Sequence, residues 1–281
     1  MGMGKARATL VGKIVIFGVL GFYLLINLFP IYWMFATSLK TDEEVYLPKP
    51  VYFPRNPTFH NYQIIFTTRP FGKYTFNTAY ISIWVAVICA LFGSLAAYGF
   101  SRFRFAGRES LRYLVLATRI FPPIALVIPF FIIFGHLGLI DTLTGQVLVN
   151  VYMWLPFSIW ILIGFFNSLP RELDEAALID GCSYFQVFSR ILLPLIFPGI
   201  AATSIIAFMG TWNEFLFNLI MAPTPAAKNL SVGASDFIAD MFISWNQMGA
   251  GAMITSIPAF VFILFFQKYI VSGLTKGAIK G

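Results

Sequence analysis

Charged and amide side chains occur at two places inside long apolar segments, where burying a charge is costly. Arg119 precedes a proline pair at 122–123 that must kink or break its helix, and Asn213 and Glu214 are neighbours in a later segment. Polar groups at such depth relay ions or protons, bind a polar solute or join helices. At about 1.5 Å per residue from the expected inner ends, Arg119 lies roughly 12 Å deep and Glu214 roughly 22 Å, which argues against a direct pair. We therefore expect these three residues along a solute pathway, with a purely structural role as the alternative.

Catalytic and nucleotide-binding motifs are absent from this sequence. It contains no G-x-x-x-x-G-K-[ST] phosphate loop, no H-E-x-x-H or C-x-x-C motif and no G-x-S-x-G nucleophile elbow. The histidines, His60 and His136, and the cysteines, Cys89 and Cys182, are widely separated in the sequence. We therefore expect no catalytic residue, metal site or cofactor-binding site in this chain.

The segment from Glu175 to Pro198 carries the signals of two short helices joined by a turn. Pro170 and the acidic residues after it predict a helix start, because proline suits the first turn and carboxylates favour the positive helix end. Gly181 fits a left-handed position at the end of that helix. Ser183 and Gln186 form an S-x-x-Q capping box that opens the second helix. The sequence therefore predicts helix, glycine turn, helix.

Side chains of this segment suit contact with a partner. Ala177 and Gly181 lie one helical turn apart and lack bulk, so a foreign surface can approach closely. Pro194 and Pro198 are expected to stop the second helix. The alternative is a helical hairpin that packs only on its own chain. An apolar stripe is expected at helical spacing in the second helix: Phe185, Phe188 and Ile191 or Leu192.

At these residues the chain resembles the membrane-spanning subunits of ATP-binding cassette (ABC) importers, whose cytoplasmic loop carries an E-A-A…G…I-x-L-P signature. The resemblance implies that this loop inserts into a groove on an ATPase subunit, with Glu175 and Asp180 making charged contacts. Cys182 stands where alanine is expected, which is a change between small residues. The matching residues are Glu175, Ala176, Ala177, Asp180, Gly181, Ile191, Leu193 and Pro194, and we add Ser183 and Phe185 to the expected ATPase-coupling set.

The composition is that of a membrane protein. The 281 residues are 58% hydrophobic and 11% charged, and the mean hydropathy is +0.79, far above that of soluble domains. We expect an all-α polytopic protein with one transmembrane permease domain over residues 1–281, and the resemblance implies the type I ABC importer fold. Six candidate spans, each near or above the roughly twenty residues required, cover about 11–36, 76–101, 111–135, 146–168, 199–222 and 249–271, with the coupling loop at 169–198.

The distribution of basic residues predicts the orientation. If both termini are cytoplasmic, twelve of the nineteen Lys and Arg residues lie on that side, six lie opposite and Arg119 lies within a span. The positive-inside rule therefore favours cytoplasmic N- and C-termini, and the resemblance places the protein in the bacterial inner membrane. The net charge of +7 reflects this orientation and does not indicate nucleic-acid binding. Four arginines share one short inner loop: Arg102, Arg104, Arg108 and Arg112.

Further segments also have an expected structure or role. Residues 37–75, rich in proline and aromatics, predict a folded outer cap in which His60 is structural rather than a ligand. The runs at 58–62 and 212–215 resemble segments of sugar-importer permeases.

In the maltose-type branch the loop equivalent to 223–247 reaches a solute-binding protein, although an ordinary surface loop is the alternative. The tail at 273–281 resembles one that threads between two ATPases, and a frayed end is its alternative. The expected binding-protein contacts are Lys228, Asn229 and Ser231.

The resemblance to the maltose and glycerol-phosphate branch implies the partners. These are a second permease subunit in a hetero-dimer, two ATPase subunits that bind ATP and magnesium, a periplasmic or extracellular solute-binding protein, and the lipid bilayer. It also implies a carbohydrate or polyol cargo, with peptide or polyamine cargo left open. Two rival hypotheses are a stand-alone secondary transporter that uses Arg119 and Glu214 as a relay, and a membrane enzyme that uses Glu214 or outer-face residues.

Overall fold

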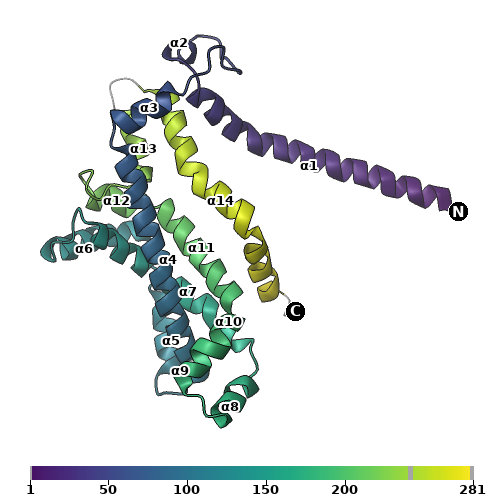
Figure 1. Ribbon diagram of the computed structural model, residues 1–281, viewed down its shortest axis with the longest axis vertical. Coiled ribbons are helices and arrows are strands. Elements are labelled where there is room, and N and C mark those ends of the chain that lie inside the picture. Colours follow the sequence, from purple (N-terminus) through teal and green to yellow (C-terminus); the bar gives the residue numbers. More distant parts are fainter. Residues whose placement is uncertain (1, 240–242, 279–281) are drawn as a thin grey trace. The chain divides into compact units, whose positions relative to one another are not determined.

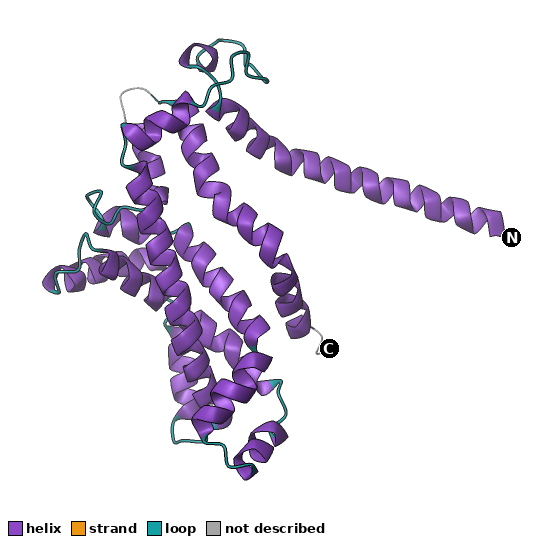
Figure 2. Cartoon of the chain, viewed as in Figure 1, coloured by secondary structure: helices purple, strands orange, loops and turns teal. Residues whose placement is uncertain are grey.

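The computed structural model describes residues 2–239 and 243–278, and this part of the chain is helical with no strand (Figure 2). The expected all-α class is therefore confirmed. The elements are α1 (Gly2–Ser38), α2 (Asp42–Val45), α3 (His60–Thr67), α4 (Phe71–Arg102), α5 (Arg108–Ala117), α6 (Pro123–His136), α7 (Leu143–Asn167), α8 (Glu172–Ile179), α9 (Tyr184–Gln186), the π-helix η1 (Val187–Leu192), α10 (Leu193–Leu195), α11 (Phe197–Trp212), α12 (Leu216–Met221), α13 (Leu230–Ala239) and α14 (Trp245–Ala278).

Residue contacts divide the chain into two compact units. One unit comprises Met1–Arg69 with Asp236–Ile254, and the other comprises Pro70–Ser235 with Thr255–Gly281. The second unit contains every residue predicted to couple to an ATPase, to line a solute pathway or to touch a binding protein.

The first unit contains the expected folded segment at 37–75 as far as Arg69. Asn61 at the start of α3 is buried, and its Nδ2 donates to the carbonyl oxygens of Ser38 and Lys40, each at 2.8 Å. A buried amide satisfied in this way ties α3 to the end of α1. His60 is exposed, and its backbone N–H donates to Thr58 Oγ1 at 3.1 Å. The segment is therefore folded as predicted.

The core of the second unit is built from α4, α7 and α11, which lie side by side (Figure 1). Small residues allow these helices to approach closely. A Cβ atom at Gly93 of α4 would lie 3.3 Å from Ser158 Cβ of α7, and one at Gly210 of α11 would lie 1.8 Å from the Trp154 ring of α7. Ala97, one turn beyond Gly93, is 0% exposed. The small pair in the second span therefore serves packing within the chain.

Two of the expected spans are each broken into two helices. The break between α5 and α6 coincides with the proline pair at 122–123 and was predicted from it. The break between α11 and α12 was not predicted, since the sequence suggested one helix over 199–222. Here α11 ends at Trp212 and α12 begins at Leu216, so the expectation of a continuous span was wrong.

Three helical stretches in the described part of the chain are long and apolar enough to cross a bilayer: Val15–Ser38, Phe71–Arg102 and Leu143–Asn167. A fourth candidate is the pair Tyr184–Leu195 and Phe197–Trp212, which is bent by 76°. Pro123–His136 is a shorter apolar helix. Pro198 lies in the first turn of α11 and therefore opens that helix, whereas the sequence suggested that it would stop the preceding one.

Candidate functional site

The E-A-A segment folds into an elbow, which we define as residues 172–195, from α8 to α10. Gly181 has φ of +86°, in the left-handed region that the sequence predicted. The capping box is formed, because the Ser183 N–H donates to Gln186 Oε1 at 2.7 Å and the Gln186 N–H donates to Ser183 Oγ at 3.3 Å. The second helix starts as α9 but widens into η1, which the sequence did not indicate.

One face of the elbow exposes apolar side chains next to acidic ones. Ile179 is 86% exposed and Phe185 is 69% exposed. Glu175 and Asp180 are also exposed. Phe185 was predicted, whereas Ile179 was missed, although its position one helical turn after Glu175 is a usable signal. Exposed large apolar side chains beside charges are typical of a surface that binds another protein.

The opposite face of the elbow is buried in its own chain, which corrects part of the sequence interpretation. Ala177 is 6% exposed and packs in a cluster with Phe188 and Leu192, which are 4% and 0% exposed. The small side chain of Ala177 therefore allows close packing within the chain and does not leave room for a partner. The predicted apolar stripe divides in two, with Phe185 facing outward and the other two residues facing inward.

The inward face of the elbow is attached to the C-terminal end of α4. Arg102 Nε lies 3.1 Å from Asp174 Oδ2, and Arg102 Nη2 donates to the Leu169 carbonyl at 3.2 Å. Arg171 Nη2 donates to the Ser101 carbonyl at 3.3 Å. The sequence gave no signal for these contacts, because Arg102 and Asp174 are separated by α5, α6 and α7. A groove of about 220 Å³ follows this junction and is lined by Tyr98, Arg102, Phe103, Arg104, Arg171, Asp174, Glu175, Leu178 and Tyr184.

Arg119 lies in the break between α5 and α6 and contacts α7. Its Nη1 donates to the Met153 carbonyl, and its guanidinium carbon lies 5.5 Å from the centre of the Trp154 ring. The side chain remains exposed beside a small pocket of about 100 Å³ that Tyr152 also lines. Arg119 is therefore accessible to a solute, as a pathway residue must be.

Glu214 stabilises the break between α11 and α12. Its carboxylate accepts from the backbone N–H of Phe217 at 2.7 Å and of Asn218 at 3.1 Å, so it caps the first turn of α12. Asn213 is exposed, and its Nδ2 donates to the Met209 carbonyl at 2.8 Å. Glu214 and Arg119 therefore have separate partners, in agreement with their expected difference in depth.

The outer loop, defined as residues 223–235, turns its predicted contact residues inward. Asn229 is 3% exposed, and its Nδ2 donates to the Glu214 carbonyl at 2.6 Å. Ser231 Oγ donates to the Trp212 carbonyl at 3.3 Å, and Lys228 Nζ lies 5.9 Å from the centre of the Tyr74 ring. Asn229 is therefore enclosed by its own chain, whereas Lys228 and Ser231 are half-buried, and the contact of these residues with a binding protein stays a prediction. The exposed part of the loop is its tip, residues 223–226.

A helical chain with broken apolar segments and an elbow that exposes large apolar side chains is typical of a membrane transport subunit. Residues 89–276 match the model of the family described as "Binding-protein-dependent transport system inner membrane component", so the chain belongs to that family. This confirms the predicted class, the permease subunit of an ABC importer, over a stand-alone secondary transporter. Permeases of this class are transport components, and separate subunits hydrolyse ATP.

Curated relatives match over almost the whole chain. The trehalose transport system permease protein SugB of Mycobacterium tuberculosis is 36% identical in an alignment that covers 99% of this chain and 100% of SugB. The trehalose/maltose transport system permease protein MalG of Thermococcus litoralis is 37% identical over 92% of this chain and 93% of MalG. The sulfoquinovosyl glycerol transport system permease protein SmoH of Agrobacterium fabrum is 34% identical over 92% of this chain and 91% of SmoH.

A solved structure has the same fold. A bacterial ABC transporter involved in the import of the acidic polysaccharide alginate contains a chain that aligns with a TM-score of 0.81 and 23% sequence identity. The alignment covers 94% of this chain and 98% of that one. The likeness supports an ABC importer fold for this sequence.

Proposed function

We propose that this chain is one of two permease subunits of an ATP-driven importer for a sugar or a sugar derivative. The cargo class is supported by the names of the relatives, which include permeases for trehalose, sulfoquinovosyl glycerol and diacetylchitobiose. The observation that carries the transport mechanism is the exposed face of the elbow, where apolar and acidic side chains surround a preformed glycine turn.

The elbow is proposed to couple ATP hydrolysis to transport. In this mechanism two ATPase subunits close around ATP and magnesium and push on the elbow, which changes the membrane helices from inward-open to outward-open. Glu175 and Asp180 supply charged contacts, while Ile179 and Phe185 supply apolar area. The short side chains of Ala176 and Gly181 let the partner approach. Ser183, Leu193 and Pro194 hold the shape of the second helix.

Six membrane spans are proposed, with both termini cytoplasmic in the bacterial inner membrane. Three of them are the stretches of suitable length and hydropathy. The remaining three are formed by α5 with α6, by α11 with α12, and by α14, which runs from Trp245 to Ala278. The four arginines between 102 and 112 support this orientation, because they fall in the inner loop beside the elbow.

A solute pathway is proposed along Arg119 and Asn213, whose side chains are exposed. Both groups can donate hydrogen bonds to sugar hydroxyls, and the nearby Trp154 and Tyr152 rings suit contact with a sugar ring. Glu214 is assigned a supporting role, since its carboxylate already caps α12. Its removal would alter the pathway by loosening the break between α11 and α12.

A solute-binding protein is proposed to dock on the tip of the outer loop. Residues 223–226 are exposed, whereas Lys228, Asn229 and Ser231 hold the loop in place behind them. The proposed contact of the C-terminal tail with the ATPases involves residues 273–281. Of these, 279–281 lie outside the described residues, and α14 includes the others.

Co-purification tests the proposed function. The tagged chain, extracted from its native membrane in mild detergent, should retain a second permease subunit and two copies of an ATPase. The recovered binding protein is then titrated with trehalose, maltose, glycerol phosphate, a dipeptide and spermidine. Saturable binding of a sugar and ATP-dependent uptake of that sugar in liposomes are expected. Uptake by the isolated chain without nucleotide would contradict the proposal.

A further inference from the structure

An ion pair attaches the elbow to α4. Arg102 is the last residue of α4, and its Nε lies 3.1 Å from Asp174 Oδ2 on α8. The two side chains are only 8% and 15% exposed. Because each charge is largely removed from water, separating them would leave two desolvated charges without compensation. The contact therefore resists separation of α4 and α8.

Neighbouring contacts join the same two elements. Arg171, just before α8, donates to the Ser101 carbonyl at 3.3 Å, and the Tyr98 hydroxyl donates to the Tyr184 carbonyl at 3.3 Å. The Tyr98 ring also packs on Phe188 of η1, with the ring centres 5.1 Å apart. We call this set of contacts, with the pair Arg102–Asp174, the clamp. It links α4 to both helices of the elbow.

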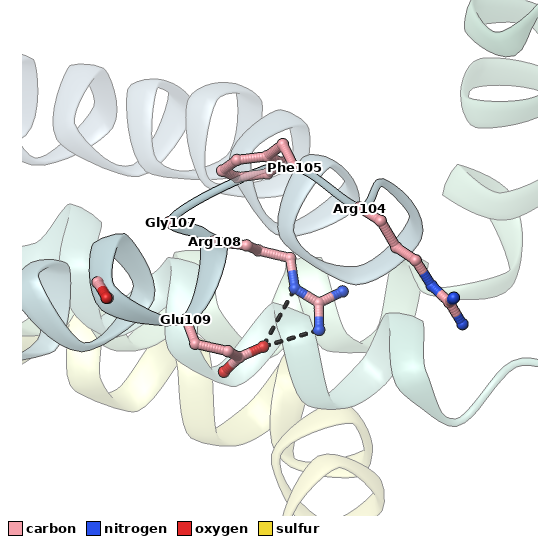
Figure 3. A pocket seen from close by; sticks show the side chains of 6 residues that line it. Arg104, Phe105, Gly107, Arg108 and Glu109 are labelled. Carbon is pink, nitrogen blue, oxygen red and sulfur yellow. Dashed lines mark hydrogen bonds and ion pairs between the residues drawn. The ribbon is translucent and has the colours of Figure 1, made fainter.

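A second ion pair, in the first turn of α5, provides a contrast. Figure 3 shows Arg108 and Glu109 paired beside Gly107, and the shortest distance is 2.7 Å, from Arg108 Nη2 to Glu109 Oε1. These side chains are adjacent in sequence and are 29% and 51% exposed. An exposed pair between neighbours adds little and joins no separate elements. Of these two ion pairs, only Arg102–Asp174 joins two separate elements of the fold.

We propose that Arg102 and Asp174 are positioning residues that make α4 move together with the elbow. The inference rests on the proposed coupling function, and it identifies α4 as the helix through which a push on the elbow reaches the other side of the membrane. Without the pair, the elbow can shift while α4 stays behind. ATP hydrolysis would then continue with less movement of the helices.

A thiol reporter at the far end of α4 measures this movement without knowledge of the cargo. Lys73 is exposed in the first turn of α4 and is replaced by cysteine, in a chain whose Cys89 and Cys182 are changed to serine. The complete importer is purified, and the rate of maleimide labelling is measured with and without Mg-ATP plus vanadate. Hydrolysis of Mg-ATP is measured in the same preparation.

With the native clamp, trapping with Mg-ATP and vanadate should change the labelling rate at least threefold. Asp174→Asn should reduce this change to less than 1.5-fold while the complex still hydrolyses Mg-ATP. The matched control Glu109→Gln should alter neither quantity. The charge exchange R102D/D174R should restore at least half of the native change, because it re-forms the pair in reverse.

Several outcomes would overturn the inference: an unchanged response in Asp174→Asn, no response with the native clamp, or a charge exchange that assembles without recovering the response. If the Asp174→Asn importer does not assemble, the labelling response of the charge exchange and of Arg171→Ala tests the inference instead. Arg171→Ala should lose part of the change in labelling rate. A native preparation that retains no ATPase would instead contradict the proposed coupling function, which separates the two failures.

Discussion

The elbow leaves large apolar side chains in solvent, whereas the outer loop turns its amide side chains inward. Ile179 and Phe185 are exposed, while Asn229 is buried and bonds to the backbone. The resemblance to ABC importer permeases implied that both segments contact a partner. The difference shows that a polar residue in a loop often serves its own chain, because buried backbone groups need partners. An exposed apolar side chain beside charges is the better sign of a docking surface.

The largest expected effect follows from removing the apolar part of the elbow surface. The double variant Ile179→Ser and Phe185→Ser should weaken ATPase binding by more than about a hundredfold, since burial of each side chain contributes about 1.5–3 kcal/mol. Titration of the purified ATPase onto the permease pair measures this. Phe105→Ser, on the adjacent inner loop, is the control and should bind normally. Unchanged affinity in the double variant would show that the elbow is not the docking surface.

A substitution of Gly181 should have the second-largest effect. Gly181 has φ of +86°, a conformation that costs a residue with a Cβ atom about 1–2 kcal/mol, and more when it is β-branched. Gly181→Val should reduce transport and stimulated ATP hydrolysis about tenfold and leave membrane insertion intact. Gly99→Ala, within α4 and with open space around it, should have little effect. Normal transport by Gly181→Val would exclude the proposed coupling role of the turn.

A substitution in the outer loop should lower the free energy of unfolding of the protein. Asn229→Ala leaves the Val232 N–H and the Glu214 carbonyl without their partners, which bond to Asn229 at 3.0 and 2.6 Å. The free energy of unfolding should fall by about 1.5 kcal/mol, measured by thermal unfolding in detergent. Ala226→Ser, at the exposed tip, should change it by less than about 0.5 kcal/mol. Equal stability of the two variants would mean that Asn229 does not hold the loop.

The smallest effect is expected at the tip itself. Pro225→Gly gives the exposed turn more freedom before docking, which costs about 0.4–1 kcal/mol. The affinity for the solute-binding protein should therefore fall about threefold, measured by titration with the labelled binding protein. Lys228→Ala should change this affinity less, because Lys228 lies over the Tyr74 ring. A larger loss with Lys228→Ala would restore that residue as a direct contact.

Local signals in the sequence predicted local structure well. The capping box of Ser183 with Gln186, the left-handed Gly181 and the helix break at the proline pair all depend on a few neighbouring residues. These features form wherever the chain supplies them, so they can be read without a structure. The class of protein also followed, because the E-A-A segment is short and specific.

Contacts between distant segments were not predictable in this way. The break after Trp212 contains no proline or glycine and depends on Glu214 reaching the first turn of α12. The burial of Ala177 depends on packing against residues of η1, and the clamp joins Arg102 to a residue far along the chain. The sequence shows the residue types in each case but not which of them meet.

The bend between the elbow and α11 affects how force is transmitted. The helices Tyr184–Leu195 and Phe197–Trp212 meet at 76°, so their axes are closer to perpendicular than to collinear. A push along the first helix therefore displaces the near end of the second sideways rather than along its length. Because α11 packs tightly on α7 at Gly210 and Trp154, that sideways displacement would tilt both helices together.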